Sequence, residues 1–165
     1  MTHNEQGIEV INASFEPVYP GIEVARGACT EIAGALHDQL SASVDLPWSS
    51  VIDGRNMLRY YRDTPLAGHI EAQAPDMHRF RNDPLFVGRA GEIVINHYPP
   101  GTAQLFHDDD GWIPPVDVVQ LSPGGYFDYL SDAGKEELEV EAGDIVRLQD
   151  IWISHRGRTK SEYER

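Results

Sequence analysis

The sequence has a single cysteine, Cys29, among 165 residues. A disulfide within the chain is therefore excluded, and the N-terminus does not combine a charged segment with an apolar one, so we expect a protein of the reducing cytoplasm. No apolar run approaches the roughly 20 residues that a membrane-spanning helix needs. A chain of 18.4 kDa can bury a core of its own, which predicts one domain over residues 1–165.

Positive charge is also scarce, because 13 Lys and Arg residues stand against 27 Asp and Glu and leave a formal net charge of -14. Such a charge repels phosphate backbones and weakens binding to nucleic acid. The composition therefore favours a small molecule or a peptide as the partner.

The first half of the chain, to about residue 90, contains one helical pattern, over residues 23–41. Apolar residues recur there near helical spacing, at Val24, Ala28, Ile32, Ala35, Leu36 and Leu40. This stripe predicts a helix packed on a sheet. Residues 57–61 read as a strand after the Asp53-Gly54 turn, whereas residues 65–84 are polar and irregular and receive no assignment.

The second half consists of short β-type runs that glycine and proline separate. The predicted strands are residues 92–98, 102–107, 116–121, 126–130, 138–140, 145–148 and 151–155. Their spacing is typical of a sandwich or jelly roll. The predicted fold class is therefore α+β, mainly β, with a jelly-roll or cupin-like core over residues 91–165 and an N-terminal helix packed on its sheet.

Three side chains in this half can meet at one point. Residues two apart in a strand share a face, so His107 and Asp109 converge while Asp108 points away. His155 ends a predicted strand that can cross to them. Two imidazoles and one carboxylate form the set that binds non-heme Fe(II) and leaves coordination positions open.

Each piece also has an ordinary structural interpretation. An isolated His-x-Asp often marks only a turn with a hydrogen-bonded histidine, and a histidine at the end of a strand is usually structural or solvated. The combination of a β-rich context, chain order and separation favours a metal site formed by His107, Asp109 and His155. The same alternation places Asn96 and Tyr98 on one face of the preceding strand and His97 on the other, which excludes His97 from the site.

The stretch Asn96-x-Tyr98-x-x-Gly101, followed after five residues by His107-x-Asp109, resembles a known family. It is similar to the Fe(II)/2-oxoglutarate-dependent dioxygenases with a double-stranded β-helix core, in the branch that includes AlkB-like and prolyl-hydroxylase-like members. The likeness covers roughly residues 91–165.

The resemblance implies that Fe(II), 2-oxoglutarate and O2 are used to hydroxylate a substrate, with release of succinate and CO2. It also implies that Asn96 and Tyr98 form hydrogen bonds with the cosubstrate. A basic residue beyond the second histidine grips the distal carboxylate in this family, and Arg165, ten positions after His155, fits that interval. Arg158 is the competing candidate.

The family's last strand continues with apolar residues where this chain stops at Arg165, so we expect a core shortened at that strand. Residues 1–90 then form a helical part that faces the substrate. Arg55, Arg59, Tyr60 and Tyr61 can line the opening of the barrel and bind an anionic or aromatic group, or form a half-buried strand with a solvated face.

A second class of function is compatible with the same short strands separated by glycine. A cupin-like barrel binds a metal or a small ligand without oxidising anything. A third possibility keeps the metal for hydrolysis or isomerisation and binds no 2-oxoglutarate.

Overall fold

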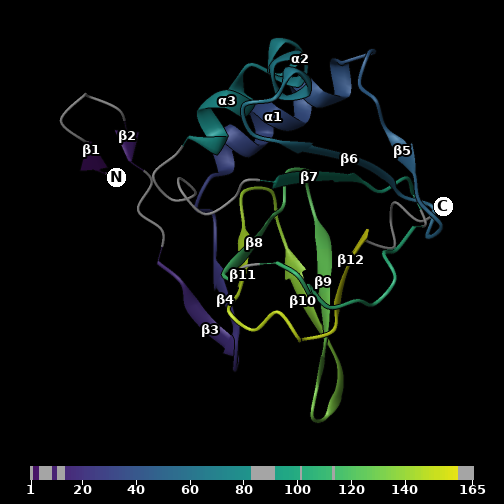
Figure 1. The fold of residues 1–165 in the computed structure, drawn as a ribbon. Coiled ribbons are helices and arrows are strands. Elements are labelled where there is room, and N and C mark those ends of the chain that lie inside the picture. Colours follow the sequence, from purple (N-terminus) through teal and green to yellow (C-terminus); the bar gives the residue numbers. More distant parts are fainter. Residues whose placement is uncertain are drawn as a thin grey trace.

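The computed structural model describes residues 14–82, 92–100, 102–112 and 114–159, together with two short paired strands, β1 (Thr2–His3) and β2 (Glu9–Val10). Antiparallel sheets hold more of the described residues than the helices do, and three helices lie together on one side of them (Figure 1). The predicted class, mainly β with few helices, is confirmed. Among the described helices, none has the length and apolar character needed to cross a membrane.

Two sheets form the β-rich core. One has the order β3-β4-β11-β8, and the other has the order β10-β9-β12. Their strands are β3 (Glu16–Tyr19), β4 (Ile22–Ala25), β8 (Val116–Val119), β9 (Gly125–Ser131), β10 (Gly134–Val140), β11 (Ile145–Leu148) and β12 (His155–Thr159). Apolar residues from both sheets, including Ile22, Phe127 and Leu148, bury one common core. The first half of the chain thus supplies two strands, β3 and β4, to this core.

The predicted helix over residues 23–41 is wrong at its start. Residues 22–25 form β4, which pairs with β11, and α1 spans Thr30–Ala42. Ile22 and Val24 are β-branched, share one face of β4 and are buried in the core, and this packing outweighs the helical spacing of Val24. Gly27, with φ of 62°, ends the extended segment before the helix.

The end of the β-rich half also differs from the prediction. Residues 151–153 form a turn, in which the Asp150 carboxylate accepts the Trp152 N–H at 2.9 Å, and His155 begins β12 instead of ending a strand. Residues 102–107 make only two isolated bridges to β12, Ala103↔Arg158 and His107↔His155.

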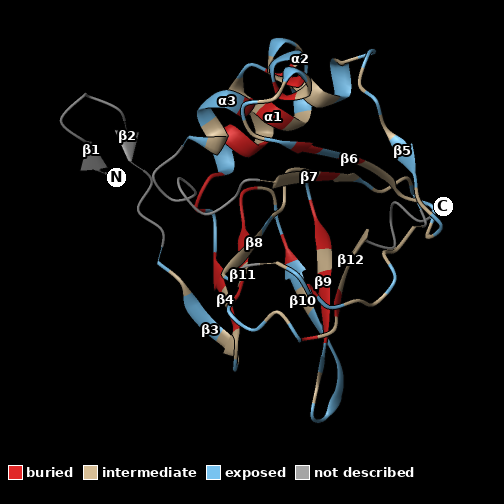
Figure 2. Ribbon diagram, in the orientation of Figure 1, coloured by how far each residue is buried: buried red, intermediate tan, exposed pale blue. Residues whose placement is uncertain are grey.

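A third sheet, β5-β6-β7, separates the helices from the β core (Figure 1). It contains β5 (Ser49–Ser50), β6 (Asn56–Tyr61) and β7 (Glu92–His97). Leu58, Tyr60 and Ile95 are buried with the apolar stripe of α1, so one face of this sheet is covered by helices (Figure 2).

Residues 65–84, which the sequence left unassigned, contain α2 (Pro65–Gln73) and α3 (Asp76–Arg81). The Thr64 hydroxyl caps α2 by accepting the Ala67 N–H at 3.3 Å, and Pro65 occupies the first turn, where its missing N–H has no cost. These start signals were present in the sequence, but the helix is too short for its apolar stripe to be distinctive.

Candidate metal centre

The backbone brings His107, Asp109 and His155 together. His107 and His155 form an antiparallel bridge, in which each N–H donates to the other residue's carbonyl, at 3.1 and 2.9 Å. The Asp109 N–H donates to the Ile151 carbonyl at 2.8 Å, which holds the next turn of the chain against the loop before β12. The three side chains are therefore positioned by hydrogen bonds of their own main chains.

The potential ligand atoms of these residues all lie within 4.8 Å of one another. Asp109 Oδ1 is 3.7 Å from His107 Nε2, and Asp109 Oδ2 is 3.4 Å from His155 Nε2. The two imidazole rings have centroids 4.5 Å apart. Such a spacing leaves room for one cation among the three groups, since first-row metals bind nitrogen and oxygen at about 2.0–2.2 Å.

The other nitrogen of each ring is occupied by a backbone carbonyl. Nδ1 of His107 lies 2.8 Å from the Leu105 oxygen, and Nδ1 of His155 lies 2.9 Å from the Ile153 oxygen. A carbonyl only accepts, so Nδ1 carries the proton and Nε2 keeps its lone pair. Histidines that bind metals are commonly oriented in this way.

The electrostatics of the cluster suit a cation. Asp109 is 8% exposed, and its Oδ2 has no hydrogen-bond donor among the described residues. Burial raises the pKa of the Asp109 carboxyl, and the two histidines oppose that change. Burial lowers the pKa of the His155 imidazole, against the Ile153 carbonyl and Asp109. A buried carboxylate that faces two bare imidazole nitrogens is a donor set that a divalent metal satisfies.

Neighbouring residues close one side of the cluster and leave Asp108 outside it. The Phe127 ring of β9 stacks on His155, with centroids 5.2 Å apart and planes 16° apart. Asp108 is exposed, and its carboxylate accepts the Asp110 N–H instead. The stacking of Phe127 was not foreseen, because the sequence gives no sign of contacts between separate strands. The carbonyl partners of the rings, each two residues before its histidine, were not foreseen because they depend on the local backbone conformation.

Tyr98 reaches the strand that carries His155. Its hydroxyl donates to Gln104 Oε1 at 3.3 Å, and the Gly157 N–H donates to the same oxygen at 3.1 Å. A Cβ on Gly157 would lie 2.6 Å from the Tyr98 oxygen, so only glycine leaves this space. Burial raises the pKa of Tyr98 to about 12 and keeps its hydroxyl protonated as a donor. Asn96 Oδ1 accepts a hydrogen bond from Arg55 Nη1 at 2.5 Å.

The two basic candidates for the cosubstrate carboxylate have different positions. Arg158 binds Asp128 through Nε and Nη2, at 2.8 and 3.0 Å, and lies 3.4 Å from Glu137. Strand alternation directs it to the opposite face of β12 from His155. Arg165 lies outside the described residues.

The four residues expected near the substrate lie in different surroundings. Arg59 is half-exposed and pairs with Glu92 at 2.7 Å, Tyr60 is buried under the helices, and Tyr61 is exposed. These three match the half-buried strand that the sequence allowed as the alternative. Arg55 alone among the four contacts a residue of the predicted site.

No protein-family model and no curated protein matches the chain. Solved structures share its fold, among them two that cover most of this chain. A prolyl-4-hydroxylase from Pseudomonas putida is 18% identical, with a TM-score of 0.52 over 84% of this chain and 85% of that one. A protein described as OsALKBH1 is 12% identical, with a TM-score of 0.51 over 88% of this chain and 89% of that one. The predicted resemblance to the double-stranded β-helix oxygenases is confirmed for the fold.

Proposed function

We propose that this chain is a non-heme oxygenase that uses Fe(II), 2-oxoglutarate and O2 to hydroxylate a small molecule, an amino acid or a peptide side chain. The observation that carries the proposal is the buried Asp109 carboxylate, whose Oδ1 faces His107 Nε2 and whose Oδ2 faces His155 Nε2 and has no hydrogen-bond donor among the described residues. The shared fold supports it. Iron and the cosubstrate, when bound, supply the oxidising chemistry and release succinate and CO2.

The protein contributes the ligands and their surroundings. His107, Asp109 and His155 bind the metal and leave the remaining coordination positions for the cosubstrate and O2. The Leu105 and Ile153 carbonyls accept from Nδ1 of the two rings and so direct Nε2 of each ring toward the metal. Phe127 excludes water from one side of His155. Tyr98 and Asn96 orient the cosubstrate, and Arg165 binds its distal carboxylate.

The substrate class follows from charge. The two similar structures are named for a prolyl hydroxylase and for an AlkB homologue, so the fold alone does not choose between a peptide and a nucleic acid. A net charge of -14 opposes a nucleic-acid substrate. We also infer that residues 1–165 act as one domain and that the protein works in the cytoplasm.

Anaerobic calorimetry tests the function directly. Mn(II) replaces Fe(II) as a redox-stable probe, and 2-oxoglutarate is titrated before and after its addition. We expect 2-oxoglutarate to bind only the metal-loaded protein, and His107→Ala to abolish both binding events. His97→Ala is the matched control, because His97 is exposed and lies at the end of β7 on its other face.

Turnover provides the second readout. With Fe(II) and O2, the natural sequence should form succinate, and His107→Ala should lower its rate by about a hundredfold or more, since second-shell changes alone cost 10–100-fold. Metal binding without 2-oxoglutarate binding would instead indicate a cupin-like or hydrolytic metal site. Succinate formation unchanged in His107→Ala would reject the ligand assignment.

A further inference from the structure

Arg55 lies directly before β6, and Tyr98 lies directly after β7. β6 and β7 are antiparallel and Asn56 pairs with His97, so Arg55 and Tyr98 flank the same end of this strand pair. Helices cover the face with Leu58 and Ile95. Alternation therefore turns Arg55 to the opposite face, toward the β core, with Asn96 and Tyr98 (Figure 1).

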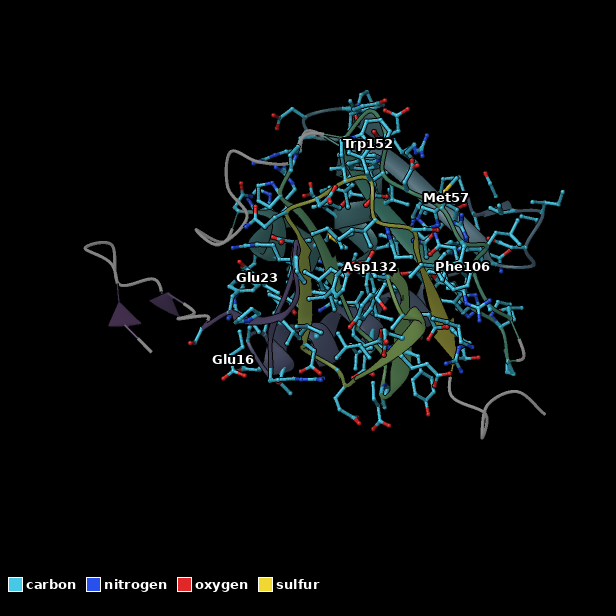
Figure 3. The ribbon with its side chains drawn as sticks, turned by 90° about the horizontal axis from the view of Figure 1, so that it is seen from below. Glu16, Glu23, Met57, Phe106, Asp132 and Trp152 are labelled. Atoms are coloured by element: carbon cyan, nitrogen blue, oxygen red, sulfur yellow. The ribbon has the colours of Figure 1, made fainter. Side chains whose placement is uncertain are left out.

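The segment that leads to His107 lies beside this face. Asp53 Oδ2 accepts the Leu105 N–H at 3.2 Å, and the Leu105 carbonyl contacts His107 Nδ1 at 2.8 Å. Figure 3 shows Met57 of β6 and Phe106 on the same side of the molecule, away from Glu16 and Glu23. Arg55 is thus joined to the metal cluster through Asp53 and the residue two positions before His107.

The Arg55 side chain is held in place and largely buried, with 12% of its surface exposed. Its Nε donates to Asp53 Oδ2 at 2.9 Å, and its Nη1 donates to Asn96 Oδ1 at 2.5 Å. Asp53, 4% exposed, also accepts the Arg55 backbone N–H, at 3.3 Å. Burial raises the pKa of Asp53, but the hydrogen bonds from Arg55 and Leu105 outweigh it and lower the pKa, so Asp53 stays ionised.

These contacts do not use all of the guanidinium. It has five N–H donors, and Nε and Nη1 account for two of them. Nη2 has no acceptor among the residues that the structure describes. A largely buried guanidinium with unused donors is suited to a carboxylate, which can accept two parallel hydrogen bonds from it.

We propose that Arg55 binds a carboxylate group of a small molecule in this active site, and that Asp53 positions it. The inference rests on the proposed function. The carboxylate has two possible sources, the distal end of 2-oxoglutarate or the substrate that is oxidised. Asn96 and Tyr98, expected to contact the cosubstrate, are the neighbours of Arg55, which favours 2-oxoglutarate and makes Arg55 the alternative to Arg165 for its distal carboxylate.

The first experiment compares 2-oxoglutarate with 2-oxovalerate, which lacks the distal carboxylate, by calorimetry on the Mn(II)-loaded protein. If Arg55 binds that carboxylate, Arg55→Gln weakens 2-oxoglutarate binding by about tenfold to a hundredfold, the effect of a lost charge-assisted hydrogen bond. The same variant should leave 2-oxovalerate binding unchanged. Arg59→Gln is the control, because Arg59 is a half-exposed arginine of β6, the strand that directly follows Arg55.

The second experiment addresses the other source. Short monocarboxylates from acetate to hexanoate, with their primary amides as controls, are titrated into protein already loaded with Mn(II) and 2-oxoglutarate. A preference for the acids over the amides that disappears in Arg55→Gln assigns the carboxylate to the oxidised substrate. The proposal is overturned if Arg55→Gln still prefers 2-oxoglutarate to 2-oxovalerate, and the acids to the amides, to the same extent as the natural sequence.

Two further measurements distinguish a failure of the Arg55 proposal from the effect of an unpaired Asp53 and from a failure of the proposed function. Arg55→Gln leaves Asp53 buried without its partner, so the Asp53→Asn/Arg55→Gln variant removes the charge and the guanidinium together and repeats the test in a neutral background. Mn(II) affinity should stay the same in both variants. If the natural sequence binds neither Mn(II) nor 2-oxoglutarate, the proposed function fails as well, which is a different result from a failure of Arg55 alone.

Discussion

At the residue scale, Asp128 of β9 is a fully buried carboxylate that binds two arginines of β12. Its Oδ2 accepts hydrogen bonds from Arg156 Nε at 2.9 Å and from Arg158 Nε at 2.8 Å. β12 also carries His155, on its other face. Asp128 therefore fixes the strand that positions one of the proposed metal ligands.

Asp128→Asn should lower the free energy of unfolding by about 2 kcal/mol, less than the roughly 3–5 kcal/mol for a wholly buried pair, because both arginines keep some contact with water. The midpoint of urea unfolding measures this loss. Asp132→Asn, in the exposed turn after β9, is the control. An equal effect of the two substitutions would contradict the role of Asp128.

The same contact predicts a dependence on pH. Burial raises the pKa of Asp128, but the hydrogen bonds from Arg158 and Arg156 outweigh it, so the pKa in the folded state lies below the ordinary value of 3.8 for an aspartate. A carboxyl with a lowered folded pKa contributes stability above the unfolded value and loses it as pH falls through the folded one. The stability difference between the natural sequence and Asp128→Asn should therefore shrink below about pH 4.

Single residues were the most predictable part of the candidate site. Alternation along a strand separated Asp109 from Asp108 and Asn96 from His97, and these placements need only the period of two. The stacking of Phe127 on His155 depends on a contact between separate strands. The carbonyls that orient the rings and the Asp53–Arg55 pair join residues only two apart, and they form because of the backbone conformation that the assembled structure gives these segments. No local pattern encodes those contacts.

At the scale of elements, the predicted bounds are wrong where the sequence fits both the period of a helix and the period of a strand. Val24 fits both a helical stripe and a strand, and burial of β4 against β11 decides for the strand. His155 was expected at the end of a strand and begins one, because Asp150 accepts the Trp152 N–H in a turn just before it. The predicted strands that correspond to β9, β10 and β11 were found because glycine turns, such as those at Gly134 and Gly143, separate them.

Helix α1 offers a test at this scale. Gly34 lies inside the helix, and a Cβ built there meets no atom within 4 Å. Gly34→Ala should therefore raise the free energy of unfolding by about 0.5–1 kcal/mol, as expected for glycine inside a helix. Urea unfolding measures it.

Gly143→Ala is a control for which we expect the opposite change in stability. A Cβ at Gly143 would lie 2.4 Å from the Thr30 Cα at the start of α1, and φ there is 91°. It should destabilise the fold. Destabilisation by Gly34→Ala would show that α1 packs more tightly at that position than the structure indicates.

At the scale of the whole molecule, the candidate metal centre joins separate parts of the chain. His107 and Asp109 precede β8, whereas His155 follows β11, and β9 and β10 lie between them in sequence. The three ligands therefore meet only when the sheets are assembled, so metal binds the folded protein and not the unfolded chain. Binding of that kind must stabilise the fold.

Mn(II) at a hundredfold excess over its dissociation constant should raise the free energy of unfolding by about 2.7 kcal/mol, and a chelator should reverse the change. Urea unfolding with and without the metal measures it. The 27 acidic residues can also bind cations weakly at the surface, so the comparison needs two variants. Asp109→Asn should abolish the stabilisation, because it removes the charge that faces both imidazoles. Asp108→Asn, an exposed neighbour with the same change in charge, should keep it. An equal stabilisation of the two variants would mean that the metal acts at the acidic surface and not at the candidate site.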